Sequence, residues 1–496
     1  MLPRSPSPAP LFAFDNTYVR DLPDYGARWQ PEAASKPRFA ALNRPLADAL
    51  GLDAERLAGD EGLAVFSGQV VPPGAEPFAQ AYAGHQFGGF SPRLGDGRAV
   101  LLGEVIDRAG QRRDLAFKGS GRTPFSRSGD GKCALGPALR EYIIGEAMHA
   151  LGIPTTRVLA VVATGDMVRR ERALPGAVLT RVAASHLRVG TFEFFAAHRG
   201  PDWVKKLADY AIARHDPALI DQDDRYAGLL DAVCRRQAEL VARWLGVGFI
   251  HGVMNTDNMT LSGETIDYGP CAFMEAYDPA AVFSSIDTHG RYAYGNQADI
   301  AQWNLARFAE TLLPLIDPDQ KQAVERATAR IVAFPAELDA AWLRVMRQKL
   351  GLPENTASAT VDRRLIDDFL DLLHRRQCDF TLAFHALTET AAGNPHAFSR
   401  VFAANDAEAA AWRSAWEGQR DPALLDAMRR ANPWLIARNH QVEAALEAAT
   451  ERFDLAPTER LVAALRAPFT LDPALARYAE PAPAEVTAAY RTFCGT

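Results

Sequence analysis

Four short motifs follow one another in a fixed order between residues 95 and 267, and they constrain the fold more than any other feature of this sequence. A glycine-rich segment comes first, then a lysine at the end of an apolar run, then a glutamate in a predicted helix, and finally two neighbouring acidic loops. The motifs are Gly95-Asp96-Gly97-Arg98, Lys118, Glu141, and the pair HGVMNTDN (251–258) and IDYG (266–269). Each motif alone is common in turns or on solvated surfaces, so only their order and spacing are informative.

This set of residues matches what a nucleoside triphosphate requires of its binding site. Glycine lets backbone N–H groups approach phosphate oxygens without a side chain in the way. A lysine neutralises phosphate charge, and a carboxylate on a facing helix holds that lysine in place. A hard divalent cation takes oxygen ligands such as an Asp carboxylate and an Asn amide. Asn258 and Asp267, on either side of a predicted hairpin, provide such a pair, and Mg²⁺ and Mn²⁺ both suit these ligands.

The order of the motifs follows the protein-kinase layout of glycine loop, strand lysine, helix glutamate, catalytic loop and metal-binding aspartate. Two positions depart from that layout. Val253 stands where the catalytic loop of a kinase carries its aspartate, and Val100 replaces the third glycine of the glycine loop. Valine cannot accept a proton, so phosphoryl transfer through the usual base is not supported. The nearest carboxylate able to act as a base is Asp257.

Hydrophobic patterning predicts a small mixed lobe followed by a large helical one. The segment 135–153 has helical periodicity that ends at Gly152. Glu141 and Glu146 both lie in this predicted helix, and either one is a candidate partner for Lys118. A second helix is predicted at 40–50, and short apolar runs predict buried strands at 99–102, 115–117, 158–163, 247–250 and 259–261.

The predicted fold class is therefore α+β, a protein-kinase-like bilobal fold with a small mixed N-lobe and a large, extended, mostly helical C-lobe. We expect an N-terminal extension at 1–75 and an N-lobe at 76–175 that holds the glycine-rich segment, Lys118 and Glu141. A helical C-lobe at 176–480 then carries the catalytic and metal-binding loops, and a tail at 481–496 carries Cys494.

Two further segments supply charge for a phosphate site. Arg181 and Arg188 are seven residues apart, so on a helix they would project from one face, and guanidinium groups donate bidentate hydrogen bonds to phosphate oxygens. The alternative is a basic helix face in water. Asp130 and Gly131 precede the predicted helix of Glu141, in a segment that is otherwise read as a flexible loop.

Composition excludes several classes of protein. Of the 496 residues, 54 are Lys or Arg and 61 are Asp or Glu, which gives a net charge of −7 and argues against a nucleic-acid partner. The five cysteines are far apart and form no CxxC pair, as is typical of a reducing compartment. No apolar run is long enough to span a membrane, and the first residues lack a signal-peptide core. We therefore expect a cytoplasmic protein with no membrane partner.

The chain resembles the selenoprotein O family of pseudokinase-like proteins, also called the YdiU family. The resemblance covers nearly the whole chain and rests on long, specific motifs. These are FDNTY (14–18), YAGHQFGGFSPRLGDGRA (82–99), LAFKGSGRTPFSRSGDGK (115–132), LREYIIGEAMHALGIPTTR (139–157), HGVMNTDNM (251–259), IDYGP (266–270), GNQADIAQWNLARFAE (295–310) and NPWLIARNH (432–440).

The resemblance implies protein adenylylation by a kinase-like fold that binds ATP in a reversed orientation. AMP would go to a Ser, Thr or Tyr hydroxyl of a protein, and pyrophosphate would leave. Asp257 is the implied proton acceptor, Glu141 pairs with Lys118, and Asn258 and Asp267 are the implied ligands of Mg²⁺ or Mn²⁺. The implied nucleotide-binding residues are Gly95, Gly97, Arg98, Lys118, Asp130, Gly131, Arg181, Arg188 and Asp267.

Three alternatives stay open at this point. Some members of the family are described as using UTP with Mn²⁺, so the transferred group is either AMP or UMP. A protein kinase that uses Asp257 as an unusual base is the second alternative, and a non-catalytic ATP-binding scaffold is the third. The family also carries a redox-active residue near its C-terminus, where this chain has Cys494, and a Cys271–Cys494 disulfide is one hypothesis for it.

Overall fold

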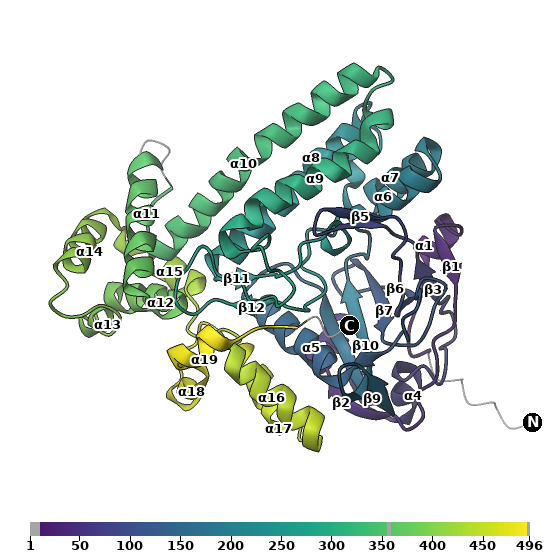
Figure 1. Ribbon diagram of the computed structural model, residues 1–496, viewed down its shortest axis with the longest axis horizontal. Coiled ribbons are helices and arrows are strands. Elements are labelled where there is room, and N and C mark those ends of the chain that lie inside the picture. Colours follow the sequence, from purple (N-terminus) through teal and green to yellow (C-terminus); the bar gives the residue numbers. More distant parts are fainter. Residues whose placement is uncertain (1–9, 355–358, 494–496) are drawn as a thin grey trace, which may run out of the picture.

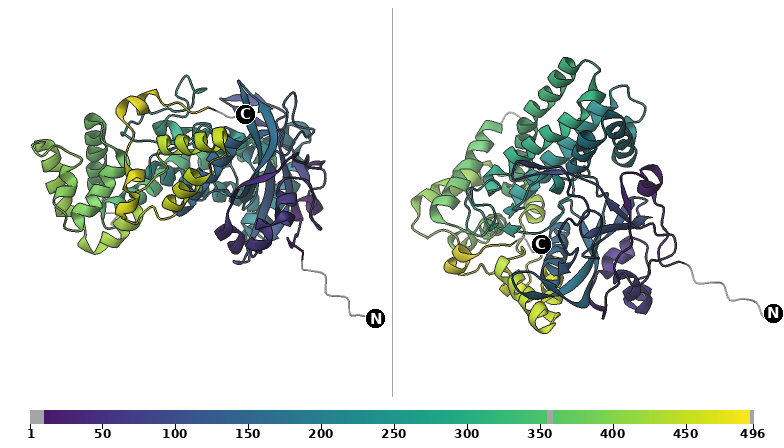
Figure 2. Two further views of the ribbon diagram at one scale, coloured as in Figure 1. Left: turned by 90° about the horizontal axis from the view of Figure 1, so that it is seen from below. Right: turned by 45° about the vertical axis from the view of Figure 1, so that its right-hand side comes forward.

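A computed structural model describes residues 10–354 and 359–493, so Cys494 and its hypothetical disulfide lie outside the described residues. The chain forms a β-sheet region next to a larger helical region (Figure 1), which confirms the predicted α+β class with a small mixed N-lobe and a large helical C-lobe. Figure 2 shows the two regions side by side along the longest dimension of the molecule.

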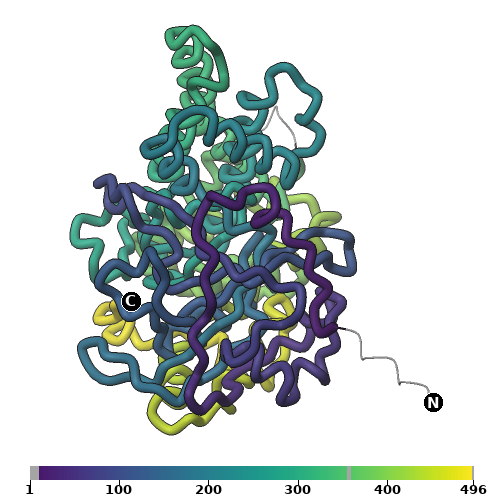
Figure 3. Tube along the Cα trace, turned by 90° about the vertical axis from the view of Figure 1, so that its right-hand side faces the viewer, coloured from purple at the N-terminus to yellow at the C-terminus, as the bar shows by residue number. Residues whose placement is uncertain are grey.

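The N-lobe is built on one antiparallel sheet with the strand order β1-β3-β6-β7-β10-β9-β2, in which β8 pairs with the outer part of β10. The strands are β1 (Gly26–Arg28), β2 (Arg38–Leu42), β3 (Phe78–Gln80), β6 (Ala99–Ile106), β7 (Arg112–Lys118), β8 (Cys133–Ala134), β9 (Arg157–Arg169) and β10 (Ala173–Ala183). Residues before position 75 therefore contribute two strands to this sheet. In Figure 3 this N-terminal segment runs across the face of the sheet region that is turned toward the viewer.

Alternation along the strands sends apolar side chains to two separate cores. On β10, Val178 and Val182 pack with the helices α2 (Arg44–Ala49), α3 (Ala54–Ala58) and α4 (Asp60–Phe66). Ala177 and Leu179 point to the other face and pack with α5 (Leu135–Ala150). Because α5 covers that face, polar residues of β10 that point to the same face as Ala177 and Leu179 also lie under the helix.

The prediction of a helix at 40–50 is partly wrong, because residues 38–42 form β2 and the helix starts only after Asn43. Asn43 accepts a hydrogen bond from the backbone N–H of Leu46, so it caps α2. The predicted hairpin after Asn258 is also wrong. Thr260 and Thr265 instead form isolated bridges to Arg188 and Thr155.

The C-lobe is a group of helices, and two short β-ribbons pack with it, one of which comes from residues 84–91 of the N-lobe segment. Its helices are α6 (Val189–His198), α7 (Pro201–His215), α8 (Arg225–Gly246), α9 (Gln297–Ile316), α10 (Gln320–Leu350), α11 (Ala359–Arg376), α12 (Phe380–Ala391), α13 (His396–Ser399), α14 (Ala407–Gln419), α15 (Leu425–Ala431), α16 (Asn439–Arg452), α17 (Ala456–Leu465), α18 (Ala476–Ala479) and α19 (Ala484–Ala489). The ribbons are β4 (Gly84–Gln86) with β5 (Gly89–Ser91), and β11 (Phe249–Ile250) with β12 (Ala272–Phe273). The short helix α1 (Thr17–Asp21) precedes the sheet.

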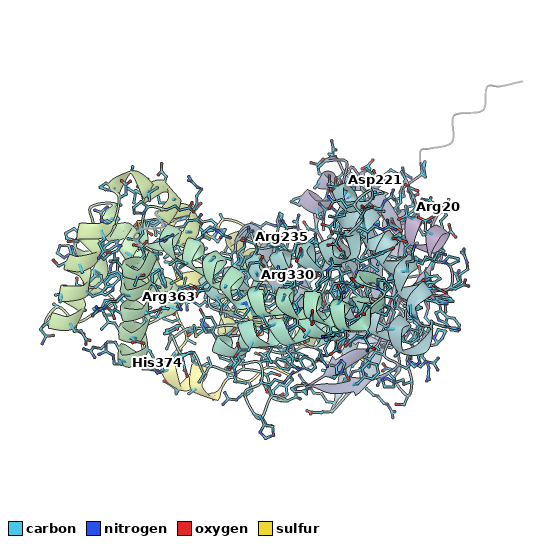
Figure 4. All side chains as sticks on the ribbon, turned by 90° about the horizontal axis from the view of Figure 1, so that it is seen from above. Arg20, Asp221, Arg235, Arg330, Arg363 and His374 are labelled. Atoms are coloured by element: carbon cyan, nitrogen blue, oxygen red, sulfur yellow. The ribbon has the colours of Figure 1, made fainter. Side chains whose placement is uncertain are left out.

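Ion pairs fix the long helices to their neighbours. Arg330 of α10 pairs with Asp231 of α8 at 2.6 Å, and Arg363 of α11 pairs with Asp339 of α10. Figure 4 labels Arg330 and Arg363 on these helices. Within the described residues, no helix is long and apolar enough to cross a membrane.

A buried ionic network joins the sheet to the helical region. Arg214 of α7 donates to Glu104 of β6 at 2.6 Å and to Asp114 of β7 at 2.7 Å. The side chains of all three residues are at most 5% exposed. Glu104 also lies 3.4 Å from Arg112, and Asp114 lies 3.0 Å from His186. Arg214 is the nearest partner of both carboxylates, and removing one partner from a buried ion pair is strongly destabilising.

Substitution Arg214→Met should therefore lower the free energy of unfolding by roughly 3–5 kcal/mol, since it removes the nearest counter-charge of two buried carboxylates. Urea denaturation measures the change. The control Arg364→Met alters a side chain that is 85% exposed and should leave the free energy of unfolding close to that of the unchanged protein. Equal stability of the two variants would contradict a structural role for the network.

Candidate functional site

A cavity of about 450 Å³ lies between the sheet and the helical region. The glycine-rich segment and the strands β6, β7 and β10 line one side, and the segment 253–267 lines the other. All the residues predicted for nucleotide binding, metal binding and proton transfer border it, namely Gly95, Gly97, Arg98, Lys118, Asp130, Gly131, Arg181, Arg188, Asp257, Asn258 and Asp267. Residues far apart in the sequence are thus gathered in one place.

Strand register explains why Lys118 and Arg181 approach the same helix. Lys118 lies two residues after Ala116 on β7, and Arg181 lies two residues after Leu179 on β10. Residues two positions apart on a strand point to the same face, so both cationic side chains lie on the face of the sheet that α5 covers. The two strands pair with Lys118 opposite Leu179 and Ala116 opposite Arg181. Figure 1 shows β7, β10 and α5 next to one another.

These two cations form a largely buried cluster with two carboxylates, in which Glu141 and Arg181 are buried and Lys118 and Asp267 are partly exposed to the cavity. Lys118 donates to Glu141 at 2.8 Å and also contacts Asp267. Arg181 donates to Glu141 at 2.6 Å and to Asp267 at 3.1 Å. Glu146, the alternative partner of Lys118, binds Arg157 and Arg466 instead. The cluster joins two strands and one helix of the N-lobe to a loop of the C-lobe.

The cluster keeps both carboxylates ionised. Burial opposes ionisation of Glu141, but Arg181 and Lys118 together lower the pKa of this carboxyl to about 2. Burial likewise opposes ionisation of Asp267, and Lys118, Arg181 and Arg98 hold its pKa well below the usual range. A carboxylate that remains charged inside the cavity is suited to bind a cation.

The glycine-rich segment packs closely on a neighbouring loop. Gly95 has a φ of +69°, and a Cβ atom at this position would lie 2.4 Å from the ring of Phe125. Gly131 has a φ of +71°, and a Cβ atom there would lie 2.1 Å from the carbonyl oxygen of Gly121. Only glycine fits at these two points. Next to Gly131, Asp130 is held by Arg170 at 2.8 Å.

The prediction that Arg181 and Arg188 share one helix face is wrong, although both residues line the cavity. Arg181 belongs to β10, whereas Arg188 has extended backbone and precedes the first residue of α6. The Arg188 guanidinium lies 4.4 Å from the ring centre of Tyr82 and donates to the carbonyl oxygen of Asp257 at 3.1 Å. Arg188 thereby connects the inner wall of the cavity with the loop of Asp257.

Asp257 lies in a single 3₁₀ turn, Thr256–Asn258, and is only 9% exposed. Burial raises the pKa of its carboxyl to about 7, although the neighbouring Arg188 opposes the rise. Within the described residues, its Oδ1 atom has no hydrogen-bond partner. A carboxyl group with an unpartnered buried oxygen and a pKa near neutrality has the properties of a general base. Val253 lines the same cavity.

The donor atoms at the cavity fit a hard divalent cation. Lys118 and Arg181 both contact Oδ1 of Asp267, and neither contact uses Oδ2. Asn258 donates its amide nitrogen to the carbonyl oxygen of Val253 at 3.1 Å, and this bond does not use its amide oxygen. Among the described residues, no group of three or more His, Cys, Asp or Glu side chains could hold a metal. Two protein oxygens completed by phosphate oxygens are a typical Mg²⁺ arrangement.

Sequence reasoning missed two residues of the site. Tyr82 stacks on Arg188, and Asn255 lines the cavity two residues before Asp257. Both lie in motifs on which the family resemblance rests, but nothing in the spacing of charged residues marks an aromatic or amide side chain.

Cys271 is buried, and burial raises the pKa of its thiol to about 12.

Comparisons with known proteins agree on one family. The model of the family described as protein adenylyltransferase SelO matches residues 11–466. A protein from Cereibacter sphaeroides named protein nucleotidyltransferase YdiU is 56% identical over 486 residues, which cover 98% of this chain and 100% of that protein. A protein with the same name from Rhizobium johnstonii is 55% identical, over 99% of this chain and 98% of that protein. Another from Chromobacterium violaceum is 57% identical, over 96% of this chain and 100% of that protein. The chain therefore belongs to the protein adenylyltransferase SelO family.

Proposed function

We propose that this chain transfers AMP from ATP to Ser, Thr or Tyr hydroxyls of proteins and releases pyrophosphate. The observation that carries the proposal is the placement of the cations. Arg181 and Arg188 are only 5% and 6% exposed, and together with Lys118 they line both the main cavity and a much smaller one of about 10 Å³. The most highly charged end of a triphosphate is attracted to these buried cations, which leaves the α-phosphate closer to the mouth of the cavity.

Asp257 acts in this proposal as the proton acceptor. The acceptor hydroxyl gives its proton to the carboxylate, and its oxygen forms a bond to the α-phosphorus. The bond between that phosphorus and the bridging oxygen breaks, and pyrophosphate leaves with the electron pair. Arg188, which donates to the backbone of Asp257, positions the base relative to the phosphates. Val253 then no longer implies an inactive protein, because the group transferred is not the terminal phosphate.

The remaining residues bind the nucleotide and the metal. We assign the triphosphate and nucleoside to Gly95, Gly97, Arg98, Lys118, Asp130, Gly131, Arg181, Arg188 and Asp267, all of which line the cavity. Asn258 and Asp267 would hold Mg²⁺ or Mn²⁺. When bound, such a cation neutralises phosphate charge and favours departure of pyrophosphate. The lobes predicted at 76–175 and 176–480 would enclose the nucleotide from two sides.

Mass spectrometry of the acceptor tests the proposed activity. The chain is incubated with ATP, Mg²⁺ and an unstructured protein rich in Ser, Thr and Tyr, and the modified peptides are sequenced. We expect an AMP ester on a hydroxyl side chain. A phosphate ester would favour a kinase that uses Asp257. Nucleotide binding without any modification would favour the non-catalytic scaffold, for which Val253 is the supporting observation. A parallel incubation with UTP and Mn²⁺ tests UMP transfer.

Substitution Asp257→Asn should reduce the turnover of AMP transfer by about 10²–10⁴-fold, the range by which general bases contribute. The affinity for ATP should change little, because no charged contact to phosphate is removed. Turnover is measured from release of pyrophosphate and affinity from calorimetry. The control Asp202→Asn alters an exposed carboxylate at the start of α7 and should behave as the unchanged protein. Full activity of Asp257→Asn would rule out its role as base.

Removal of divalent metal with a chelator should abolish transfer, and either Mg²⁺ or Mn²⁺ should restore it. Substitution Asn258→Ala should raise the metal concentration needed for half-maximal activity by at least about tenfold, because even groups that only orient a metal ligand contribute this much. Activity is titrated against metal at saturating ATP, with thermal unfolding as the check on folding. An unchanged metal requirement would remove Asn258 from the metal site.

A further inference from the structure

A second cavity, of about 500 Å³, opens directly beside the first. Phe87 and Ile286 line both cavities, so the two are adjacent. The remaining lining residues come from the segment 286–300, namely Asp287, Thr288, His289, Arg291, Asn296, Asp299 and Ile300. None of them belongs to the nucleotide or metal residues assigned above, so this cavity has no role in the function proposed so far.

The β4–β5 ribbon connects the second cavity with the reacting group. Gly84, at the start of β4, lies against Asp257 so closely that an added Cβ would be 2.5 Å from its Oδ1 atom. Phe87 follows Gly84 by three residues at the tip of the ribbon. At the rise of an extended strand, three residues span roughly 10 Å. When an extended segment of the protein substrate places its acceptor hydroxyl at Asp257, the residue of that segment that lies beside Phe87 is therefore about three positions away from the hydroxyl-bearing residue.

The tip of the ribbon is held in a fixed position. The backbone N–H of Phe87 donates to Asn255 at 3.1 Å, and the Tyr292 hydroxyl donates to the same oxygen at 2.7 Å. The rings of Phe87 and Tyr292 lie 5.1 Å apart in an edge-to-face arrangement. Phe87 also has a φ of +50°, which is rare for a bulky residue and is tolerated where surrounding contacts impose it. The exposed ring is thus preorganised.

Two apolar side chains of this cavity are exposed and can contact a ligand. Phe87 is 39% exposed and Ile286 is 48% exposed. The Asp287 carboxylate accepts hydrogen bonds from the backbone N–H groups of Arg291 and Tyr292 at 2.9 and 2.7 Å. The Arg291 guanidinium lies 5.0 Å from the ring centre of Trp303. The Asp287 carboxylate is thus used within the protein, while the exposed phenyl ring and aliphatic side chain form the apolar part of a cavity that His289 and Asp299 also line.

We propose that the second cavity binds the acceptor segment of the protein substrate and selects an apolar side chain about three positions from the hydroxyl that receives AMP. The apolar side chain inserts between Phe87 and Ile286, while the hydroxyl enters the first cavity beside Asp257. This inference rests on the proposed function, because it assigns to that reaction the site where its second substrate binds. Fixed aromatic surface next to an active site is a common way to hold an extended peptide at low entropic cost.

Matched synthetic peptides test the inference. Each peptide carries one Ser in an otherwise identical extended sequence, with either Leu or the polar Asn about three positions from it. The enzymes are the unchanged chain, Phe87→Ala, Ile286→Ala and the control Phe90→Ala. Phe90 lies on the same ribbon and is 44% exposed, but it lines neither cavity. Transfer of AMP, binding of the peptide by fluorescence anisotropy and binding of ATP are measured separately.

We expect the unchanged chain and Phe90→Ala to use the Leu peptide at least about tenfold more efficiently than the Asn peptide, as apolar pockets discriminate to this degree. Phe87→Ala and Ile286→Ala should lose that preference through a higher KM for peptide, with unchanged ATP affinity. Equal preference in Phe87→Ala and Phe90→Ala would overturn the inference. If no acceptor receives AMP, the proposed function fails. Peptide binding that depends on Phe87 would in that case still support the second cavity as a peptide-binding site.

Discussion

The site depends on the ion pairs between four charged side chains at the junction of the sheet and the helical region, namely Lys118, Glu141, Arg181 and Asp267. Moving an ion out of water costs several kcal/mol, and that cost is recovered only when counter-charges are in place. The partners come from β7, α5, β10 and the loop before β12. The cluster therefore forms only when the sheet region and the helical region have packed together, and the same packing creates the cavity.

The cluster also sets the charge of the cavity. Two cations and two carboxylates nearly cancel, whereas Arg98 and Arg188 add positive charge along the same wall. A triphosphate brings negative charge and its own metal, so it can replace part of the contact between Asp267 and the two cations. The chain as a whole carries a net charge of −7, so the attraction for phosphate is local and comes from buried guanidinium and ammonium groups.

Motif order was sufficient to predict the fold class, and motif order together with the family resemblance named the residues that line the cavity. Lys118 ends an apolar run, and that position places it under α5. Contacts between distant segments could not be predicted in the same way. Arg181 and Arg188 were expected on one helix, since a spacing of seven suits a helix, but a strand and a loop bring them to the same wall.

Aromatic residues illustrate the same limit. Tyr82 and Phe87 lie in a glycine-rich stretch whose pattern suggests only turns, and their roles appear once Arg188 and Tyr292 are placed beside them.

The choice between Glu141 and Glu146 also needed the structure, because both lie in α5 and only the direction of each side chain separates them. Glu141 faces the two strands that carry Lys118 and Arg181, whereas Glu146 faces Arg157 and Arg466.

The central claim is that buried cations hold the terminal phosphates inward, so that the α-phosphate meets the acceptor hydroxyl beside Asp257. The most direct measurement uses ATP labelled with radioactive phosphorus at either the α- or the γ-position, each incubated with the chain, metal and an acceptor protein. The account predicts that protein acquires label from α-labelled ATP and none from γ-labelled ATP. Labelling of protein from the γ-position but not from the α-position would contradict it.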